Sequence, residues 1–201
     1  MRYILNVSMI IFSTLAFSQE KMNLLDYATN YVEFEKDDVQ IINGLLYTNS
    51  YFNPKLLSGD IKVLDYYNSG KLYSEEYYED GELTWIWYFF ENGRISDLIS
   101  YKNGKRHGFT REYCNDCRSA KYLLYEVEYK NGVKHGLERY WYANGRLFVE
   151  ENYENGLKEG EHKTYYLNGN LQTKGNYYYD NREGLWIHYR KNGSRHYTEY
   201  Y

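Results

Sequence analysis

The chain has 201 residues, of which 28 are tyrosine and one is proline, and its formal net charge at pH 7 is −4. An acidic chain is not expected to bind the phosphate backbone of nucleic acids or an anionic membrane surface, because both favour clustered cations. Tyrosine packs well on a pleated surface and proline is almost absent, so the composition favours β-strands.

The first 18 residues have the pattern of a secretory signal peptide. Arg2 supplies a positive start, a mostly apolar run follows, and the small residues Ala16 and Ser18 stand where signal peptidase reads the chain. The alternatives are a buried strand or a membrane anchor, but the apolar run is shorter than the roughly 20 residues that span a bilayer. We therefore predict cleavage after Ser18 and a protein exported to the periplasm, the cell envelope or the medium.

Residues 19–57 lack the periodicity of the rest, and we predict that they form an N-terminal leader and capping segment. Residues 19–43 fit either a short amphipathic segment or a disordered leader, and strand-like runs begin at "GLLYTNSYF". Residues 58–201 are predicted to be a repeat array. Its first repeat, "SGDIKVLDYYNSGKL", is imperfect and places Gly70 in a hairpin turn. Terminal repeats are often atypical because they cap the stack.

Glycines mark a repeat of about 24 residues along the array. One set ends stretches such as "KNGVKHG" and "ENGLKEG", and a second set follows nine residues later, each time after asparagine. Cys117 takes the place of the second glycine in one repeat. The glycines that we assign to repeat turns are Gly70, Gly93, Gly108, Gly136, Gly145, Gly160, Gly169, Gly184 and Gly193.

Each repeat contains two runs of strand length. "LERYWYA" and "RLFVEENYE" flank Asn144 and Gly145, a pair that tolerates the positive φ angles of a tight hairpin turn. The second connection, "ENGLKEG", has glycine at both ends and predicts a wider turn. The fold class is therefore all-β: an elongated open antiparallel sheet of tandem β-hairpin repeats.

Aromatic residues form two columns with the same period. One column is Phe89, Tyr113, Trp141, Tyr165 and Tyr189, and the other is Tyr77, Tyr101, Tyr129, Tyr153, Tyr177 and Tyr201. Same-face neighbours on antiparallel strands lie close together, and a tyrosine ring buries apolar area while its hydroxyl stays wet. We predict that stacked ring ladders hold a thin sheet together. The alternative is that the rings are offered to a sugar or another polymer.

The residues that could carry chemistry are few. Cys114 and Cys117 are the only cysteines, and in an oxidising compartment we predict a local disulfide, with two free thiols as the alternative. His107 and His135 share a column, but column neighbours are about 9.6 Å apart, too far to share a metal directly. We expect no catalytic residues, no metal site and no cofactor, and hence no enzyme.

The segments "YKNGKRHG", "YKNGVKHGLERYWYANGRL", "YENGLKEGEHKTYYLNGNL" and "YYDNREGLWIHYRKNG" resemble the MORN-repeat variant. Over roughly residues 58–201 the chain is similar to proteins of the YwqK family, the antitoxin component of a toxin–antitoxin module. The resemblance implies a MORN-like hairpin array, a protein partner that includes toxin-like proteins, and no catalytic residues.

The function expected from the sequence is that of an exported, non-enzymatic repeat scaffold that binds another protein. An antitoxin-like or immunity-like role is one version of this function. The alternative is an envelope carbohydrate- or cell-wall-binding module that uses aromatic faces. A membrane-lipid role ranks lower because the chain is acidic.

Overall fold

The computed structural model describes residues 31–50, 54–117 and 123–201. The predicted signal peptide, and the first part of the predicted leader, lie outside these residues. The elements are β1 (Val32–Glu35), the 3₁₀ helix η1 (Lys36–Asp38), β2 (Val39–Ile42), β3 (Leu45–Thr48), β4 (Asp60–Tyr66), β5 (Leu72–Glu79), β6 (Glu82–Phe89), β7 (Ile95–Lys102), β8 (Lys105–Tyr113), β9 (Leu123–Lys130), β10 (Val133–Trp141), β11 (Leu147–Glu154), β12 (Leu157–Tyr165), β13 (Leu171–Tyr178), β14 (Asn181–Tyr189) and β15 (Arg195–Tyr200). No helix in this part of the chain is long and apolar enough to cross a membrane.

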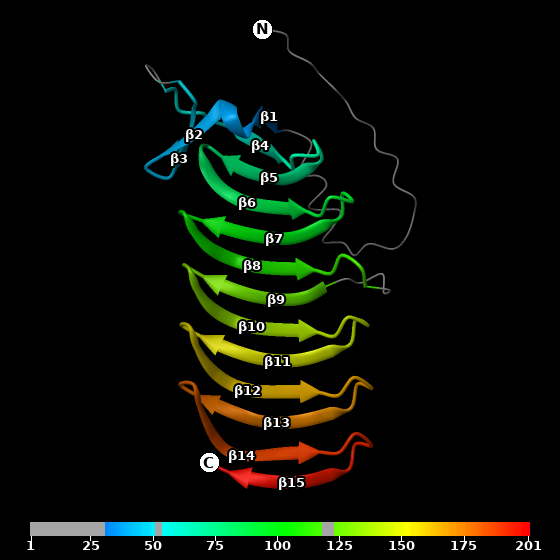
Figure 1. Cartoon of the computed structure of the whole chain (residues 1–201). Coiled ribbons are helices and arrows are strands. Elements are labelled where there is room, and N and C mark those ends of the chain that lie inside the picture. Colours follow the sequence, from blue (N-terminus) through cyan, green and yellow to red (C-terminus); the bar gives the residue numbers. More distant parts are fainter. Residues whose placement is uncertain (1–30, 51–53, 118–122) are drawn as a thin grey trace. The chain divides into compact units, whose positions relative to one another are not determined.

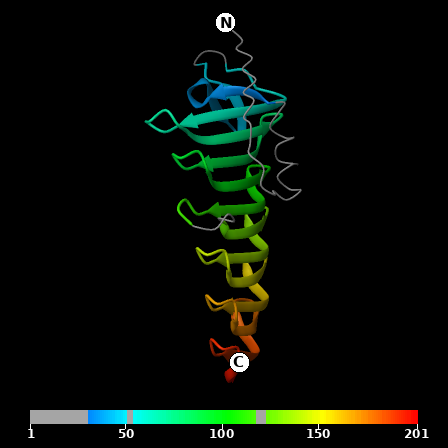
Figure 2. The ribbon, with the colours of Figure 1, turned by 90° about the vertical axis from the view of Figure 1, so that its right-hand side faces the viewer.

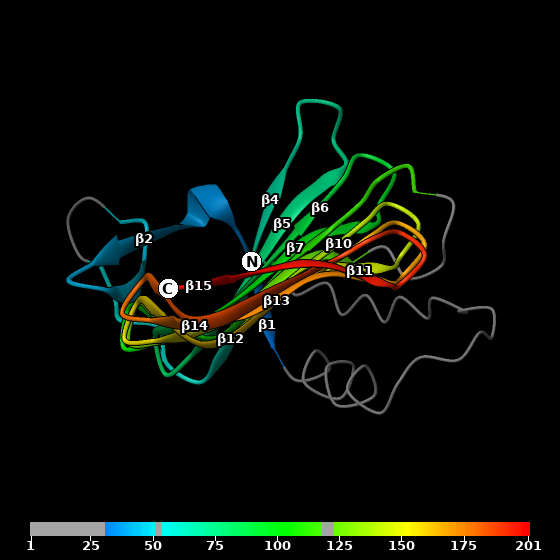
Figure 3. The same cartoon turned by 90° about the horizontal axis from the view of Figure 1, so that it is seen from below.

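All fifteen strands belong to one sheet, and β4 to β15 follow one another in sequence order as antiparallel neighbours (Figure 1). β1 adds to the outer edge of β4 in parallel, and β2 and β3 form a hairpin that joins the sheet through β6. Seen from the side, the later strands form a single layer (Figure 2). Seen from below, successive strands rotate steadily, which is the normal twist of a β-sheet (Figure 3). The prediction of an all-β open sheet of tandem hairpins is confirmed.

The tight hairpin turns occupy a different place in the repeat from the one predicted. In the β9–β10 hairpin Lys130 pairs with Val133, so the turn consists of Asn131 and Gly132 alone, with φ angles of 53° and 89°. Positive φ at both central residues defines the type I′ turn, whose twist matches that of the strands. Equivalent two-residue turns are Asn43-Gly44, Asp80-Gly81, Asn103-Gly104, Asn155-Gly156 and Tyr179-Asp180.

The predicted tight turn at Asn144 and Gly145 is instead a five-residue connection. The amide of Gly145 donates to the carbonyl oxygen of Tyr142, and the amide of Tyr142 donates to that of Arg146. Only the glycine has a positive φ, as in a type I turn followed by a glycine bulge. Gly70, Gly93, Gly169 and Gly193 lie in connections with the same hydrogen bonds. In Figure 1 these connections lie on the right of the sheet and the two-residue turns on the left.

Four glycines predicted to end wide turns lie inside strands instead. Gly108, Gly136, Gly160 and Gly184 belong to β8, β10, β12 and β14, all with positive φ. In β10 three residues, His135 to Leu137, stand opposite the single residue Glu128, so the glycine lies in a bulge. A Cβ atom at Gly136 would lie 2.2 Å from a carboxylate oxygen of Glu128. The recurring glycine is therefore required by this bulge rather than by a turn.

The hydrophobic core lies at the N-terminal end of the sheet. Leu46 of β3, Ile61 and Val63 of β4 and Tyr78 of β5 are almost fully buried against one another. The β2–β3 hairpin therefore covers one face of the first strands. It belongs to the segment predicted from the sequence as a leader and capping segment.

Candidate binding faces of the sheet

One face of the sheet carries the second aromatic column, and we name it the tyrosine face. The column consists of Tyr78, Tyr101, Tyr129, Tyr153, Tyr177 and Tyr201. Tyr129, Tyr153 and Tyr177 are the strand partners of the bulge glycines Gly108, Gly136 and Gly160, and Tyr201 exchanges two backbone hydrogen bonds with Gly184. The other column, from Phe89 to Tyr189, lies half-buried on the opposite face, at the margin of the five-residue turns.

The first member of the tyrosine column is Tyr78, not the predicted Tyr77. Tyr78 stands three residues before Gly81, as Tyr129 stands three residues before Gly132. The bulge in β6 contains one extra residue, whereas the bulge in β10 contains two. The sequence prediction assumed the same spacing in every repeat and therefore arrived one residue too early, at Tyr77. Tyr77 therefore lies on the opposite face, where its ring packs 5.1 Å from that of Trp87.

The sequence predicted that the tyrosines of this column stack on one another, and this prediction is wrong. Column neighbours lie two strands apart, about 9.6 Å, which exceeds the 4.5–7 Å of ring contacts. From Tyr129 onward, a cation from the preceding strand covers each ring of the column instead. The distances to the ring centroid are 5.5 Å for Arg106 over Tyr129, 4.8 Å for Lys134 over Tyr153, 5.2 Å for Lys158 over Tyr177 and 5.2 Å for Arg182 over Tyr201. These cation–π pairs link each repeat to the next.

Buried carboxylates run beside the tyrosines. Glu138 is only 1% exposed; its carboxylate accepts hydrogen bonds from the hydroxyls of Tyr125 (2.5 Å) and Tyr140 (3.3 Å) and forms an ion pair with Lys134. Burial and the Glu138 carboxylate raise the pKa of Tyr140 to about 12. The same causes raise the pKa of Tyr125. Both hydroxyls therefore remain protonated donors, as a buried carboxylate requires.

Glu151 repeats this arrangement on the next strand. Its carboxylate lies 2.8 Å from Nζ of Lys158, 3.1 Å from Nδ1 of His162 and 3.5 Å from the hydroxyl of Tyr153. Burial alone would raise the pKa of Glu151, but the hydrogen bonds from His162 and Lys158 outweigh burial and lower it to about 2. The group is therefore an ionised structural carboxylate at neutral pH.

Further along this row, beyond His162 of β12 and Gly175 of β13, lies a tryptophan of β14. The ring of Trp186 is 1% exposed and lies over Gly175, where a Cβ atom would be 2.2 Å from the indole. Its Nε1 donates to the carbonyl oxygen of Asn176, and Arg182 stacks 4.3 Å from its ring. The absence of a side chain at Gly175 thus creates the slot for the indole.

The opposite face carries a ladder of alternating charges at its centre, and we name it the charged-ladder face. Arg111, Glu126, Arg139 and Glu150 are successive strand partners. Their ion pairs measure 2.7 Å, 3.6 Å and 2.8 Å between the closest charged atoms. Opposite charges on facing positions stabilise a strand pair, so this ladder holds the middle of the array together.

Exposed apolar side chains line the margin of the charged-ladder face that lies nearest the two-residue turns. We name them the apolar strip; they are Phe109, Val133, Leu137, Leu157 and Leu185, each 38–49% exposed. They recur on every second strand from β8 to β14. Apolar side chains gathered beside charged ones are typical of protein-interaction surfaces.

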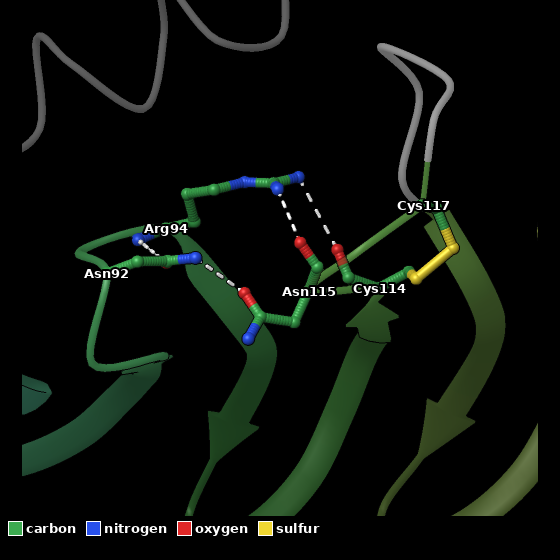
Figure 4. The surroundings of a disulfide bond; sticks show 5 residues. All are labelled: Asn92, Arg94, Cys114, Asn115 and Cys117. Carbon is green, nitrogen blue, oxygen red and sulfur yellow. Dashed lines mark hydrogen bonds between the residues drawn. A yellow bond between two sulfur atoms is a disulfide. The ribbon is translucent and has the colours of Figure 1, made fainter.

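The turns at the other margin are joined by side-chain hydrogen bonds. The hydroxyls of Tyr67, Tyr142 and Tyr166 donate to the carbonyl oxygens of Phe89, Tyr165 and Tyr189, at 2.7–2.8 Å. The irregular connection after β8 is held differently (Figure 4). Its Cys114 and Cys117 form a disulfide, with Cα atoms 5.7 Å apart.

Arg94 of the preceding turn completes this connection. Its guanidinium donates to the carbonyl oxygens of Asn115 (2.5 Å) and Cys114 (3.4 Å), and the amide of Asn92 donates to the side chain of Asn115 at 2.6 Å (Figure 4). The disulfide thus stands where the other repeats have their turn glycine.

Sequence reasoning missed the cations, the buried carboxylates and the apolar strip. The cations had a signal, because Arg106, Lys134, Lys158 and Arg182 each stand two residues before a bulge glycine. The ring of His107 accepts a backbone hydrogen bond from Asn131. Within residues 31–50, 54–117 and 123–201, no group of three or more His, Cys, Asp or Glu side chains could hold a metal.

The family model described as MORN repeat variant matches residues 60–80, 134–155 and 158–177. Each match covers one hairpin around a five-residue turn, namely β4–β5, β10–β11 and β12–β13. No curated protein is significantly similar to the chain. The three matched hairpins are therefore similar to MORN-variant repeats, and they lie within a sheet of tandem hairpins that continues beyond them.

Proposed function

We propose that the protein is a non-enzymatic scaffold that binds another protein through its charged-ladder face. The observation that carries this proposal is the apolar strip, whose side chains stay exposed in repeat after repeat beside a satisfied charge ladder. MORN repeats are in general modules that bind proteins or membranes. The acidic net charge of −4 favours the protein partner over an anionic lipid surface.

The scaffold is proposed to act outside the cytoplasm. The first 18 residues have the composition of a signal peptide, and a disulfide between Cys114 and Cys117 suits an oxidising compartment. A toxin-like partner, neutralised in the manner of an immunity protein, is the finer form of the proposal. It is supported by the resemblance to YwqK-family antitoxins.

A second candidate, binding of an envelope carbohydrate, is favoured by the exposed rings beside the five-residue turns. Tyr73, Tyr140, Phe148 and Tyr197 are 36–47% exposed along the margin of the tyrosine face. Aromatic rings that recur along an array could stack on successive sugars. The two candidates use opposite faces and opposite margins of the sheet, so point variants separate them.

The test is capture of a partner by variants of the mature protein. Immobilised wild type is incubated with envelope extract of its own cell, and bound proteins are identified by mass spectrometry. Leu137→Asp introduces a charge into the apolar strip and should reduce capture about tenfold or more, the size of a lost interface anchor. The matched control is Leu167→Asp in a five-residue turn, where the leucine is more exposed still.

We expect that one partner protein is retained by wild type and by Leu167→Asp and is lost with Leu137→Asp. The two variants should have the same circular dichroism spectrum as wild type. Equal capture by Leu137→Asp contradicts the proposed surface. Retention of cell-wall polysaccharide by wild type, abolished by Tyr140→Ala, would instead support the second candidate.

A further inference from the structure

The charge ladder is complementary to its own reversed copy. From β8 to β11 it consists of Arg111, Glu126, Arg139 and Glu150, and their side chains are 13–32% exposed. The ladder begins with a cation and ends with an anion. Reading the four positions in the opposite order therefore inverts every sign. A second copy of the ladder, laid over the first in reverse, would place an opposite charge over each charge.

Two charged-ladder faces can meet in two symmetric orientations. A closed dimer has a two-fold axis, and between two facing sheets this axis runs either along the array or along the strands. An axis along the array lays each strand over its own copy, so that Arg139 would oppose Arg139. An axis parallel to the strands reverses the strand order instead. Only the second orientation uses the complementarity of the ladder.

An axis that lies between β9 and β10 pairs all four charges. Strand β9 then lies over β10 of the second copy, and β8 lies over β11. Glu126 faces Arg139, and Arg111 faces Glu150. By symmetry each of these pairs occurs twice, so the interface contains four contacts between opposite charges.

The residues that continue the ladder row fit the same axis. On β6 and β7 the row holds Trp87 and Leu98, and on β12 and β13 it holds Lys163 and Lys174. The axis lays Leu98 over Lys163 and Trp87 over Lys174, and an indole attracts a cation. From β6 to β13 no like charges oppose each other along the row.

Other positions of the axis match the charges less well. An axis between β10 and β11 would oppose two cations, Arg111 and Lys174. An axis between β8 and β9 would lay Arg139 over the buried Leu98. An axis that coincides with a strand would oppose the charge of that strand to itself. The order of charges along the row therefore selects the axis between β9 and β10.

The margin beside the five-residue turns adds apolar contacts. The ring column on the even-numbered strands alternates with half-buried aliphatic residues on the odd-numbered strands, namely Ile95, Leu123, Leu147 and Leu171. The selected axis lays even-numbered strands over odd-numbered ones. Trp141 therefore faces Leu123, and Tyr113 faces Leu147. The axis also keeps the two apolar strips on one margin, where their members alternate.

The size and shape of the face suit a stable dimer. Strands about 4.8 Å apart, with about six residues of about 3.3 Å each, give β6 to β13 a face of roughly 750 Å². A standard protein interface buries about 800 Å² on each partner. Two sheets of the same twist pack face to face with their strands aligned within about 30°. The described strands from β8 onward form a single layer, to which a second sheet can be added (Figure 2).

We infer that the charged-ladder face binds a second copy of this chain, in a two-fold dimer whose axis lies between β9 and β10. The inference rests on the proposed function, because it names an occupant of the same face. The opposed charges set the register, and the apolar margins supply the buried area. A partner protein of another kind must displace the second copy to reach this face.

Analytical ultracentrifugation of the purified protein tests the dimer. Interfaces of this size bind with a micromolar Kd or tighter, so protein at about 100 µM should sediment as a dimer. Leu147→Lys sets a cation against Tyr113 of the second copy and should raise the Kd at least tenfold. The matched control is Leu167→Lys in a five-residue turn, where the leucine is 56% exposed and the Kd should not change.

A charge-reversed chain tests the register without breaking the ion pairs of the ladder within each sheet. This variant combines Arg111→Glu, Glu126→Arg, Arg139→Glu and Glu150→Arg, so its ladder still alternates and is still complementary to its own reversed copy. It should form dimers with itself. Against wild type, however, every charge of the ladder meets a like charge. Mixed dimers, counted by copurification of differently tagged chains, should be at least tenfold rarer than random mixing gives.

The outcomes separate the dimer from the proposed function. Wild type that is monomeric at about 100 µM overturns the inference, and so does a Leu147→Lys dimer as tight as that of wild type. Mixed dimers at the random frequency also overturn it, because the chains would then associate through another surface. All variants should keep the wild-type circular dichroism. A monomeric wild type that still captures a partner through Leu137 would overturn the dimer and leave the proposed function standing.

Discussion

The N-terminal strands and the later strands use the same face of the sheet in different ways. Over β4 and β5 the β2–β3 hairpin covers this face. The covered side chains of the sheet are Ile61, Val63 and Tyr78, which pack against Leu46 of the hairpin. From β8 onward the described strands have their main contacts with neighbouring strands only. There the same face buries Glu138, Glu151 and Trp186.

The difference shows two ways of stabilising one side of a sheet. A second layer removes water, so apolar side chains suffice and the gain follows the buried apolar area. Without a second layer, long side chains on the sheet itself must shield the row beneath them. Tyrosine and lysine do this because each combines an apolar body with a polar tip that can bond a carboxylate.

The consequence for function is that the array stabilises itself within one layer. Each hairpin is joined to its neighbours by strand pairing, cation–π contacts and turn hydrogen bonds, as in other repeat proteins. Among the described strands from β8 onward, no second layer packs on the charged-ladder face, which agrees with the proposed partner surface.

The largest expected effect is that of Gly175→Ala in the uncovered array. A Cβ atom would lie 2.2 Å from the Trp186 ring, so the indole must leave its slot. The expected loss is about 3–5 kcal/mol, as for the removal of a buried tryptophan. Chemical denaturation followed by tryptophan fluorescence measures it, with the exposed Asn176→Ala as control. Unchanged stability would show that the slot is not needed.

In the covered region the matching change is Leu46→Ala. Leu46 is 1% exposed and touches the centre of the core, so the expected loss is about 2–5 kcal/mol. Ile41→Ala on the same hairpin is the control, because Ile41 is 54% exposed and should cost little. Equal losses for the two variants would argue that the hairpin does not form a core with the sheet.

Glu151 allows a pH-dependent test of the polar row. Its folded pKa of about 2 lies below the value of about 4.3 expected in the unfolded chain. The ionised group therefore stabilises the fold above about pH 4.3, and this contribution is lost as the pH falls towards 2. Glu151→Gln should melt lower than wild type at pH 7, and the gap should close in acid. A gap that is independent of pH would contradict the assignment of the Lys158 and His162 contacts.

The smallest expected effect is a gain from Tyr179→Asn. Tyr179 has φ of 48° in a two-residue turn, at a position where four other turns of the described residues have asparagine, namely Asn43, Asn103, Asn131 and Asn155. A left-handed conformation costs a tyrosine more than an asparagine, so the variant should gain about 0.5–1 kcal/mol. The converse, Asn155→Tyr, should lose a similar amount in thermal denaturation. A loss with Tyr179→Asn would mean that the Tyr178–Tyr179 ring contact outweighs the strain.

The repeat period, the strands and the open sheet could be predicted from the sequence because glycine and tyrosine recur in strict register. The assignment of the turns could not, because both connections contain Asn-Gly. They differ in length, two residues against five, and in the backbone of the asparagine, which has positive φ at Asn131 but not at Asn144. The shift from Tyr77 to Tyr78 was hidden because both residues are tyrosine and β6 lacks a residue of the usual bulge.

The candidate surfaces were less accessible to sequence reasoning. Glu138 and Glu151 are indistinguishable in sequence from solvated charges, and only strand register brings tyrosine hydroxyls and lysines to them. The basic column before each bulge glycine was visible in the sequence, but its meaning depends on the ring across the strand.

We conclude that the covered end of the sheet is held by one core and the array by local contacts between neighbouring hairpins. Amide hydrogen exchange, read strand by strand in wild type, Leu46→Ala and Gly175→Ala, tests this conclusion. Gly175→Ala should speed exchange in β13 to β15 and leave β4 to β6 protected, whereas Leu46→Ala should do the reverse. If either variant speeds exchange equally in all strands, the sheet unfolds as one unit and the claim is contradicted.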